Sequence, residues 1–115
     1  MIEERAWGKF EVLLDEPGYK VKRITVNAGH RLSYQSHENR AELWHFVKGV
    51  GCVTLEDNNI DVKYDDVIKI PRRAKHRIAN TGKKELVFIE TQTGDSFEEE
   101  DIVRYSDDYG RVTPA

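Results

Sequence analysis

Four side chains with metal-binding atoms are spaced in this sequence as a single site would require. Gln35 and His37 are two residues apart, so an extended chain points both side chains to the same face. Glu42 follows at the start of an apolar run, and His76 follows the segment that ends at Pro71. On neighbouring strands of a barrel, two imidazoles, a carboxylate and an amide oxygen would converge on one divalent metal ion. Such donors suit Zn, Mn, Fe, Co or Ni.

The same residues also fit simpler roles. Taken singly, His37 or His76 is a surface or hydrogen-bonded histidine, and Glu42 could pair with Arg40. The spacing alone leaves both interpretations open. His30 lies in the turn after Gly29, and His45 lies on the opposite face of its strand from Trp44. We expect both to be structural or exposed.

The elements that position the candidate metal ligands are predicted β-strands, short runs rich in Val, Ile, Tyr, Phe and Thr. Turn residues separate the runs at intervals of about ten residues, which is typical of an all-β barrel or jelly roll. One segment, Ser96–Val103, has a capping-box spacing and predicts at most one short helical segment. We interpret the acidic run Glu98–Asp101 as a solvated face. The predicted strands are Lys9–Leu14, Tyr19–Val26, Leu43–Val47, Val50–Glu56, Ile60–Tyr64, Val67–Ile70, Arg77–Asn80 and Glu85–Thr91.

Two of these runs, Leu43–Val47 and Leu86–Ile89, are apolar on both strand faces. Strands of that kind lie between two covering layers, and a second copy of the chain would supply one of them. We therefore expect a homodimer. With no linker, fixed-period repeat or low-complexity tract, residues 1–115 are expected to form a single domain.

Composition excludes several classes of protein. The 18 Lys and Arg residues are outnumbered by 21 Asp and Glu, which argues against a nucleic-acid-binding protein. No apolar stretch approaches the length of a membrane span, and acids near the start, such as Glu3 and Glu4, argue against a secretory signal. The lone Cys52 has no partner for an internal disulfide, so we expect a reducing, cytoplasmic location.

Two motifs resemble those of the cupin superfamily. The pattern G-x5-Q-x-H-x4-E-x6-G over residues 29–49 resembles the first cupin motif, in which the position of Gln35 is usually a second His. The pattern P-x4-H-x3-N over residues 71–80 resembles the second motif. The resemblance implies a cupin-type jelly-roll barrel.

The match narrows to the type II mannose-6-phosphate isomerase domain and spans about residues 5–111. The segment R-L-S-x-Q-S-H at 31–37 and the segment R-A-E-x-W at 40–44 are specific within cupins. The other similar segments are R-x-W-G at 5–8, Y-x-V-K-R-I at 19–24, K-H-R at 75–77, I-V-R at 102–104 and Y-G-R at 109–111.

This resemblance implies a metal-dependent isomerase that interconverts mannose 6-phosphate and fructose 6-phosphate through an enediol. The implied metal ligands are Gln35, His37, Glu42 and His76. For catalysis we expect Glu38 as the general base, because it is close in sequence, together with Arg40. Phosphate binding requires Arg or Lys, since Arg offers a bidentate fork. The candidates are Arg40, Lys75, Arg77 and Arg111.

The sequence departs from this family at two histidine positions, which hold Asn39 and Leu43 here. Two alternatives therefore stay open. One is a non-catalytic cupin that binds a sugar phosphate; the other is a small cupin metalloenzyme such as a non-haem iron oxygenase, since two histidines and a carboxylate also form that triad. The domain often follows a nucleotidyltransferase, for which 115 residues leave no room, so we do not expect guanylyltransferase activity.

Overall fold

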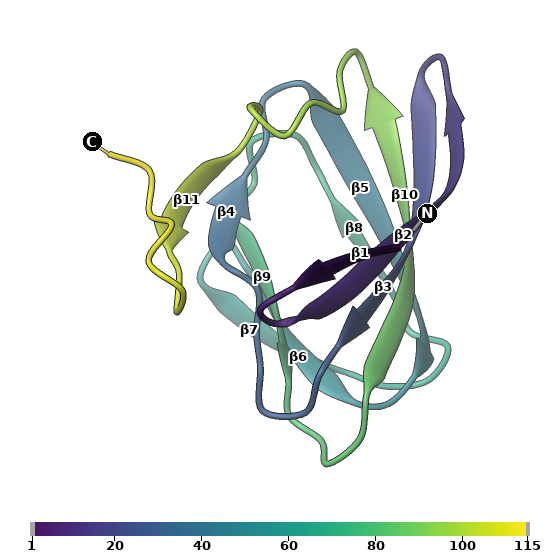
Figure 1. Ribbon diagram of the computed structural model, residues 1–115, viewed down its shortest axis with the longest axis vertical. Helices are drawn as coiled ribbons and strands as arrows, with labels where there is room; N and C mark the ends of the chain where they lie inside the picture. The colour runs from purple at the N-terminus through teal and green to yellow at the C-terminus, as the bar shows by residue number, and fades with distance from the viewer. Residues whose placement is uncertain (1, 115) are drawn as a thin grey trace.

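The computed structural model describes residues 2–114, which form two antiparallel β-sheets facing each other as a flattened barrel (Figure 1). The first sheet holds, in spatial order, β1 (Ile2–Arg5), β2 (Gly8–Glu16), β3 (Tyr19–Val26), β10 (Leu86–Gly94), β5 (Arg40–Lys48) and β8 (Val67–Ile70). The second holds β11 (Val103–Ser106), β4 (Tyr34–Ser36), β9 (His76–Asn80), β6 (Gly51–Leu55) and β7 (Asn58–Val62). The all-β, double-sheet prediction is confirmed.

All eight predicted strands are present, and two of them, β3 and β8, have the predicted bounds. The sequence patterns missed β1, β4 and β11, which are three or four residues long and mostly polar. These strands exist because a neighbouring strand supplies hydrogen-bond partners: β1 pairs with β2, and β4 pairs with both β9 and β11. Such long-range pairing leaves no local pattern in the chain.

The segment expected to form a short helix is instead a loop with a single turn. The main-chain N–H of Asp101 donates to the carbonyl of Glu98, and β11 begins at Val103. The Asp101 carboxylate accepts the N–H groups of Glu38 and Asn39, so it anchors the loop to the chain before β5 rather than capping a helix. No helix occurs between residues 2 and 114. Figure 1 shows this loop joining β10 to β11 over one end of the barrel.

The hydrophobic core fills the barrel between the sheets. Phe46 on β5 and Phe88 on β10 are fully buried, and their ring centres lie 5.1 Å apart. Trp44 packs on Phe88 at 4.9 Å and marks where the apolar core gives way to polar side chains. The other buried apolar residues are Trp7, Phe10, Ile24, Val26, Val53, Val62, Ile70, Ala74, Ile78 and Leu86.

The outward face of the first sheet carries apolar side chains that this chain does not cover. Leu43 on β5 and Val67 on β8 are exposed. Homodimerisation through such a face stays a prediction. Among the described residues no helix could span a membrane.

Candidate metal centre

Alternation along β5 brings charged groups into the barrel beside aromatic ones. Arg40, Glu42, Trp44 and Phe46 are all buried, whereas the residues between them are less buried or exposed. This two-residue period is that of a strand with one face in the core. His45 therefore points outward, as the sequence predicts.

Three side chains from three segments of the chain meet inside the barrel. His37 precedes β5, Glu42 lies on β5, and His76 begins β9. Their ligand atoms all lie within 4.8 Å of one another. The Glu42 carboxylate is 3.3 Å from His37 Nε2 through Oε2 and 3.6 Å from His76 Nε2 through Oε1. Gln35 is the register partner of His76 in the β4–β9 pair and lines the same cavity.

Hydrogen bonds on the far side of each imidazole fit this cluster for a metal ion. His37 Nδ1 donates to the carbonyl of Asp101 at 2.8 Å, and His76 Nδ1 donates to the carbonyl of Ala74 at 2.9 Å. Because a carbonyl only accepts, each neutral ring has its hydrogen on Nδ1 and a lone pair on Nε2. Both Nε2 atoms face the Glu42 carboxylate, so the lone pairs of two imidazoles and one carboxylate converge on one point. A divalent cation is the partner that this donor set suits.

The environment keeps both imidazoles neutral, which metal binding requires. Burial, with smaller effects of the nearby Arg40 cation and of His76, lowers the pKa of His37 to about 3. Burial lowers the pKa of His76 to about 4, against the raising effect of its hydrogen bond to Ala74.

Arg40 is the cation closest to the cluster. Its Nε donates to Glu42 Oε2 at 3.0 Å, and its Nη2 donates to His37 Nε2 at 3.2 Å. The sequence left open whether Glu42 pairs with Arg40 or clusters with the histidines. In the structure it does both.

A second buried carboxylate lies next to the cluster. The indole N–H of Trp44 lies 3.0 Å from both Glu42 Oε1 and Glu90 Oε2, so it bridges the two acids. Gln92 donates to Glu90 Oε1 at 2.7 Å. Burial and, to a smaller extent, the Glu42 charge raise the pKa of Glu90 to about 7. Burial also lowers the pKa of the nearby Lys22.

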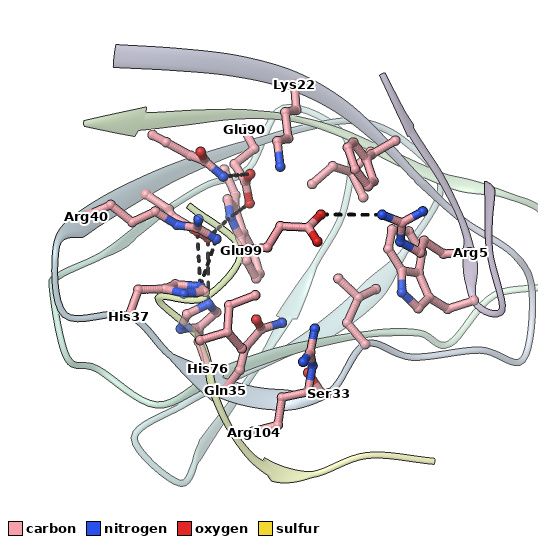
Figure 2. Close-up of a pocket in the computed structure, with 18 of the residues that line it drawn as sticks. Arg5, Lys22, Ser33, Gln35, His37, Arg40, His76, Glu90, Glu99 and Arg104 are labelled. Atoms are coloured by element: carbon pink, nitrogen blue, oxygen red, sulfur yellow. Dashed lines mark hydrogen bonds and ion pairs between the residues drawn. The ribbon is translucent and has the colours of Figure 1, made fainter. Parts of the chain in front are cut away.

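These groups open into a cavity of about 330 Å³, within the usual range for small-molecule sites (Figure 2). Figure 2 shows His37, His76 and Arg40 on one side, Lys22 and Glu90 above, and Arg5 on the opposite side. The cavity therefore has a cluster of atoms able to bind a metal ion at one end and the Arg5 guanidinium at the other.

Of the four basic residues predicted to bind phosphate, two line the cavity and two do not. Arg40 and Arg111 line the cavity. Lys75 does not: its Nζ lies 4.7 Å from the centre of the Tyr105 ring. Arg77 also lies outside the cavity lining, and its Nε donates to the carbonyl of Leu32 at 2.8 Å.

Glu38, nominated as the base, is not among the residues that line the cavity. Its side chain is 62% exposed, and its carboxylate accepts a hydrogen bond from Arg73 at 2.6 Å. His30 and His45 also lie outside the cavity lining.

Several lining residues were not nominated from the sequence. Glu90 and Gln92 alternate with the buried Phe88 on β10, so a charged residue at an inward strand position was the available signal. Lys22 lies on β3, a strand that the sequence predicts, but its place in the cavity depends on which strands pair. Three further charged lining residues lie on short strands or a loop that have no local signature: Arg5, Glu99 and Arg104.

Comparison with known proteins identifies the domain. Residues 3–107 match the family model described as mannose-6-phosphate isomerase C-terminal. The chain is 43% identical to the mannose-1-phosphate guanylyltransferase of Escherichia coli K12 over 94% of its length. It is 41% identical, again over 94% of its length, to the alginate biosynthesis protein AlgA of Pseudomonas aeruginosa. It covers 23% and 22% of these relatives, so it spans about a quarter of their length.

The fold is similar to solved cupin structures. The Schizosaccharomyces pombe Cnp3 cupin domain superposes with a TM-score of 0.73 at 24% identity, over 76% of this chain and 64% of that one. That likeness shows the fold, and confirms the prediction of a cupin-type barrel. With the family match over most of its length, the chain belongs to the mannose-6-phosphate isomerase C-terminal family.

Proposed function

We propose that this domain is a metal-dependent isomerase that interconverts mannose 6-phosphate and fructose 6-phosphate. The observation that carries the proposal is the convergence of His37, Glu42 and His76 inside a cavity with the Arg5 guanidinium at its other end. The family match supports the choice of sugar phosphate.

His37, Glu42 and His76 would hold the metal ion, with Gln35 beside them. When bound, the ion would act as a Lewis acid toward the carbonyl and hydroxyl oxygens of the open-chain sugar. The buried Arg40 guanidinium lies against the same cluster and would stabilise negative charge that develops on those oxygens.

The reaction needs a group that carries a proton between two carbons. A proton leaves C2 of the aldose, its electron pair forms the C1–C2 double bond, and the C1=O1 π pair moves to O1, which takes up a proton to give the enediol. The O2 hydroxyl proton then leaves as the C2=O2 bond forms, and the C1–C2 π pair takes up a proton at C1 to give the ketose. We assign this transfer to Glu90, because its carboxylate lines the cavity and is oriented by Trp44 and Gln92. Glu38 is the alternative, and a direct comparison of variants separates the two.

Gln92 also offers a contact for the sugar. Its Oε1 is buried and lacks a hydrogen-bond partner among the described residues, although its amide nitrogen is held by Glu90. A buried acceptor without a donor is costly, and a sugar hydroxyl would supply the donor. This contact favours a polyol over an apolar substrate.

The test is the formation of fructose 6-phosphate from mannose 6-phosphate by metal-loaded protein. We expect His76→Gln to lose activity by at least about 100-fold, because it removes a ligand. His45→Gln is the matched control on the outward face and keeps wild-type turnover. If metal-loaded wild type binds the sugar phosphate without converting it, the isomerase proposal fails and the non-catalytic binding cupin takes its place.

A further inference from the structure

Outside the histidine cluster, the cavity is lined by arginines from both ends of the chain. Arg5 ends β1, Arg104 lies on β11, and Arg111 follows β11. Figure 2 shows Arg5 on the side of the cavity opposite His37 and Arg104 at its lower edge, between Gln35 and Arg5.

These arginines differ in how far their charges are already matched. Arg111 forms a two-point ion pair with Asp107, with Nε and Nη2 at 2.9 and 3.1 Å from its carboxylate oxygens. Arg104 has no comparable partner: its Nε is buried and makes no hydrogen bond within the part of the chain that the structure describes. Burial and the neighbouring Arg111 charge lower the pKa of Arg104. A buried N–H donor without an acceptor is costly, and an anion in the cavity would supply the acceptor.

A carboxylate from this chain lies in the same part of the cavity. Glu99, on the loop between β10 and β11, directs Oε1 toward Arg5 Nη2 at 3.4 Å (Figure 2). Its side chain is 73% exposed, so the contact is long and surface-like. Glu99 also contributes to the electrostatic environment of Arg104. A carboxylate with one weak contact is readily displaced by an anion of higher charge.

We propose that Arg5 and Arg104 form the subsite for the phosphate of a phosphomonoester, and that Glu99 competes with that phosphate for them. The proposal deepens the proposed isomerase function and rests on it for the choice of substrate. The phosphate supplies several acceptor oxygens for the unmatched Arg104 donor and for the arginine fork of Arg5. The sugar carbons would then extend from this subsite toward the histidines.

The test is calorimetric titration of metal-free protein with inorganic phosphate, which requires no turnover. We expect Arg104→Gln to weaken binding at least about 10-fold, since it removes a charge-assisted donor. Arg104→Lys restores the charge without the fork, and we expect intermediate affinity. Arg23→Gln is the matched control, because Arg23 is exposed on β3 and pairs with Glu11 outside the cavity; it binds phosphate as wild type does.

Glu99→Gln provides the opposite signature. Removing the competing charge is expected to tighten phosphate binding several-fold, an effect that damage to the fold would not produce. Equal affinity in wild type and a folded Arg104→Gln variant would overturn the subsite. Unchanged affinity in Glu99→Gln would overturn the competition. An absence of isomerase activity would contradict the proposed function only. The phosphate titration would still test the subsite, because it requires no turnover.

Discussion

His37 Nδ1 lies 2.8 Å from the main-chain carbonyl oxygen of Asp101, and this hydrogen bond connects an imidazole of the candidate metal site to the loop between β10 and β11. The Asp101 carboxylate also accepts the N–H groups of Glu38 and Asn39, the two residues after His37. One residue therefore fixes both the ring orientation of His37 and the backbone beside it.

Asp101→Ala is expected to lower metal affinity about 10-fold, because groups that orient a ligand contribute on this scale. The main-chain carbonyl remains in the variant, but the side-chain contacts that hold it in place are lost. Competition with a chromophoric chelator measures the affinity. Glu100→Ala, on the same exposed loop, is the control, and equal zinc affinity in the two variants would contradict the role of Asp101.

Stability of the metal-free protein is expected to fall as the pH drops from 6.5 to 4.5. The folded-state pKa values of His37 and His76, about 3 and about 4, lie below the ordinary 6.5. As the pH falls, each histidine therefore binds a proton in the unfolded chain before it does so in the folded one. The free energy of unfolding then falls by about 1.4 kcal/mol per pH unit for each histidine. The pKa of Glu90 is raised from the ordinary 4.5 to about 7, so its carboxyl binds a proton in the folded state first and offsets the effect of one histidine. The net loss in the free energy of unfolding is about 1.4 kcal/mol per pH unit.

Urea denaturation with chelator present checks this pH dependence. Glu90→Gln removes the opposing group and is expected to steepen the loss to about 3 kcal/mol per pH unit. A free energy of unfolding that rises between pH 6.5 and 4.5 would show that the histidines are not buried in neutral form.

The proton-transfer group is tested by comparing Glu90→Gln with Glu38→Gln. We expect Glu90→Gln to reduce kcat by about 100-fold or more, as removal of a general base does, while metal affinity stays within a few-fold of wild type. The steady-state rate of fructose 6-phosphate formation measures both variants. A large loss in Glu38→Gln together with retained turnover in Glu90→Gln would transfer the role to Glu38.

Gly94→Ala is expected to destabilise the protein by about 3 kcal/mol. The φ of Gly94 is +152°, and an added Cβ would collide with the carbonyl oxygen of Asn39. Gly29→Ala is the control: its φ is +80°, but the space around it is open, so the cost is about 1 kcal/mol. Thermal unfolding of the two variants checks the difference.

Much of the architecture and the clustering of His37, Glu42 and His76 could be predicted from sequence. Strand alternation is a local pattern, so strands such as Tyr19–Val26 can be predicted from the sequence. The same two-residue period predicts that Gln35 and His37 point to one face. Placing Glu42 and His76 in one cluster required more than periodicity. The motif resemblance supplied that long-range information.

The rest of the cavity could not be predicted because it depends on which distant segments pair. Arg5 and Arg104 lie on short strands that exist only through their partners. The acidic run Glu98–Asp101 has the composition of a solvated face, yet Glu99 lines the cavity and Asp101 anchors the loop. Composition gives the polarity of such a segment but not the groups that face it.

The most direct test of the proposed function is proton NMR of mannose 6-phosphate in D2O with metal-loaded protein and with protein stripped by chelator. The proposal predicts fructose 6-phosphate, with deuterium at C1 in the turnovers in which the proton carried by Glu90 exchanges with solvent, and no product after chelation. Unchanged mannose 6-phosphate in the presence of protein shown to hold its metal would contradict it.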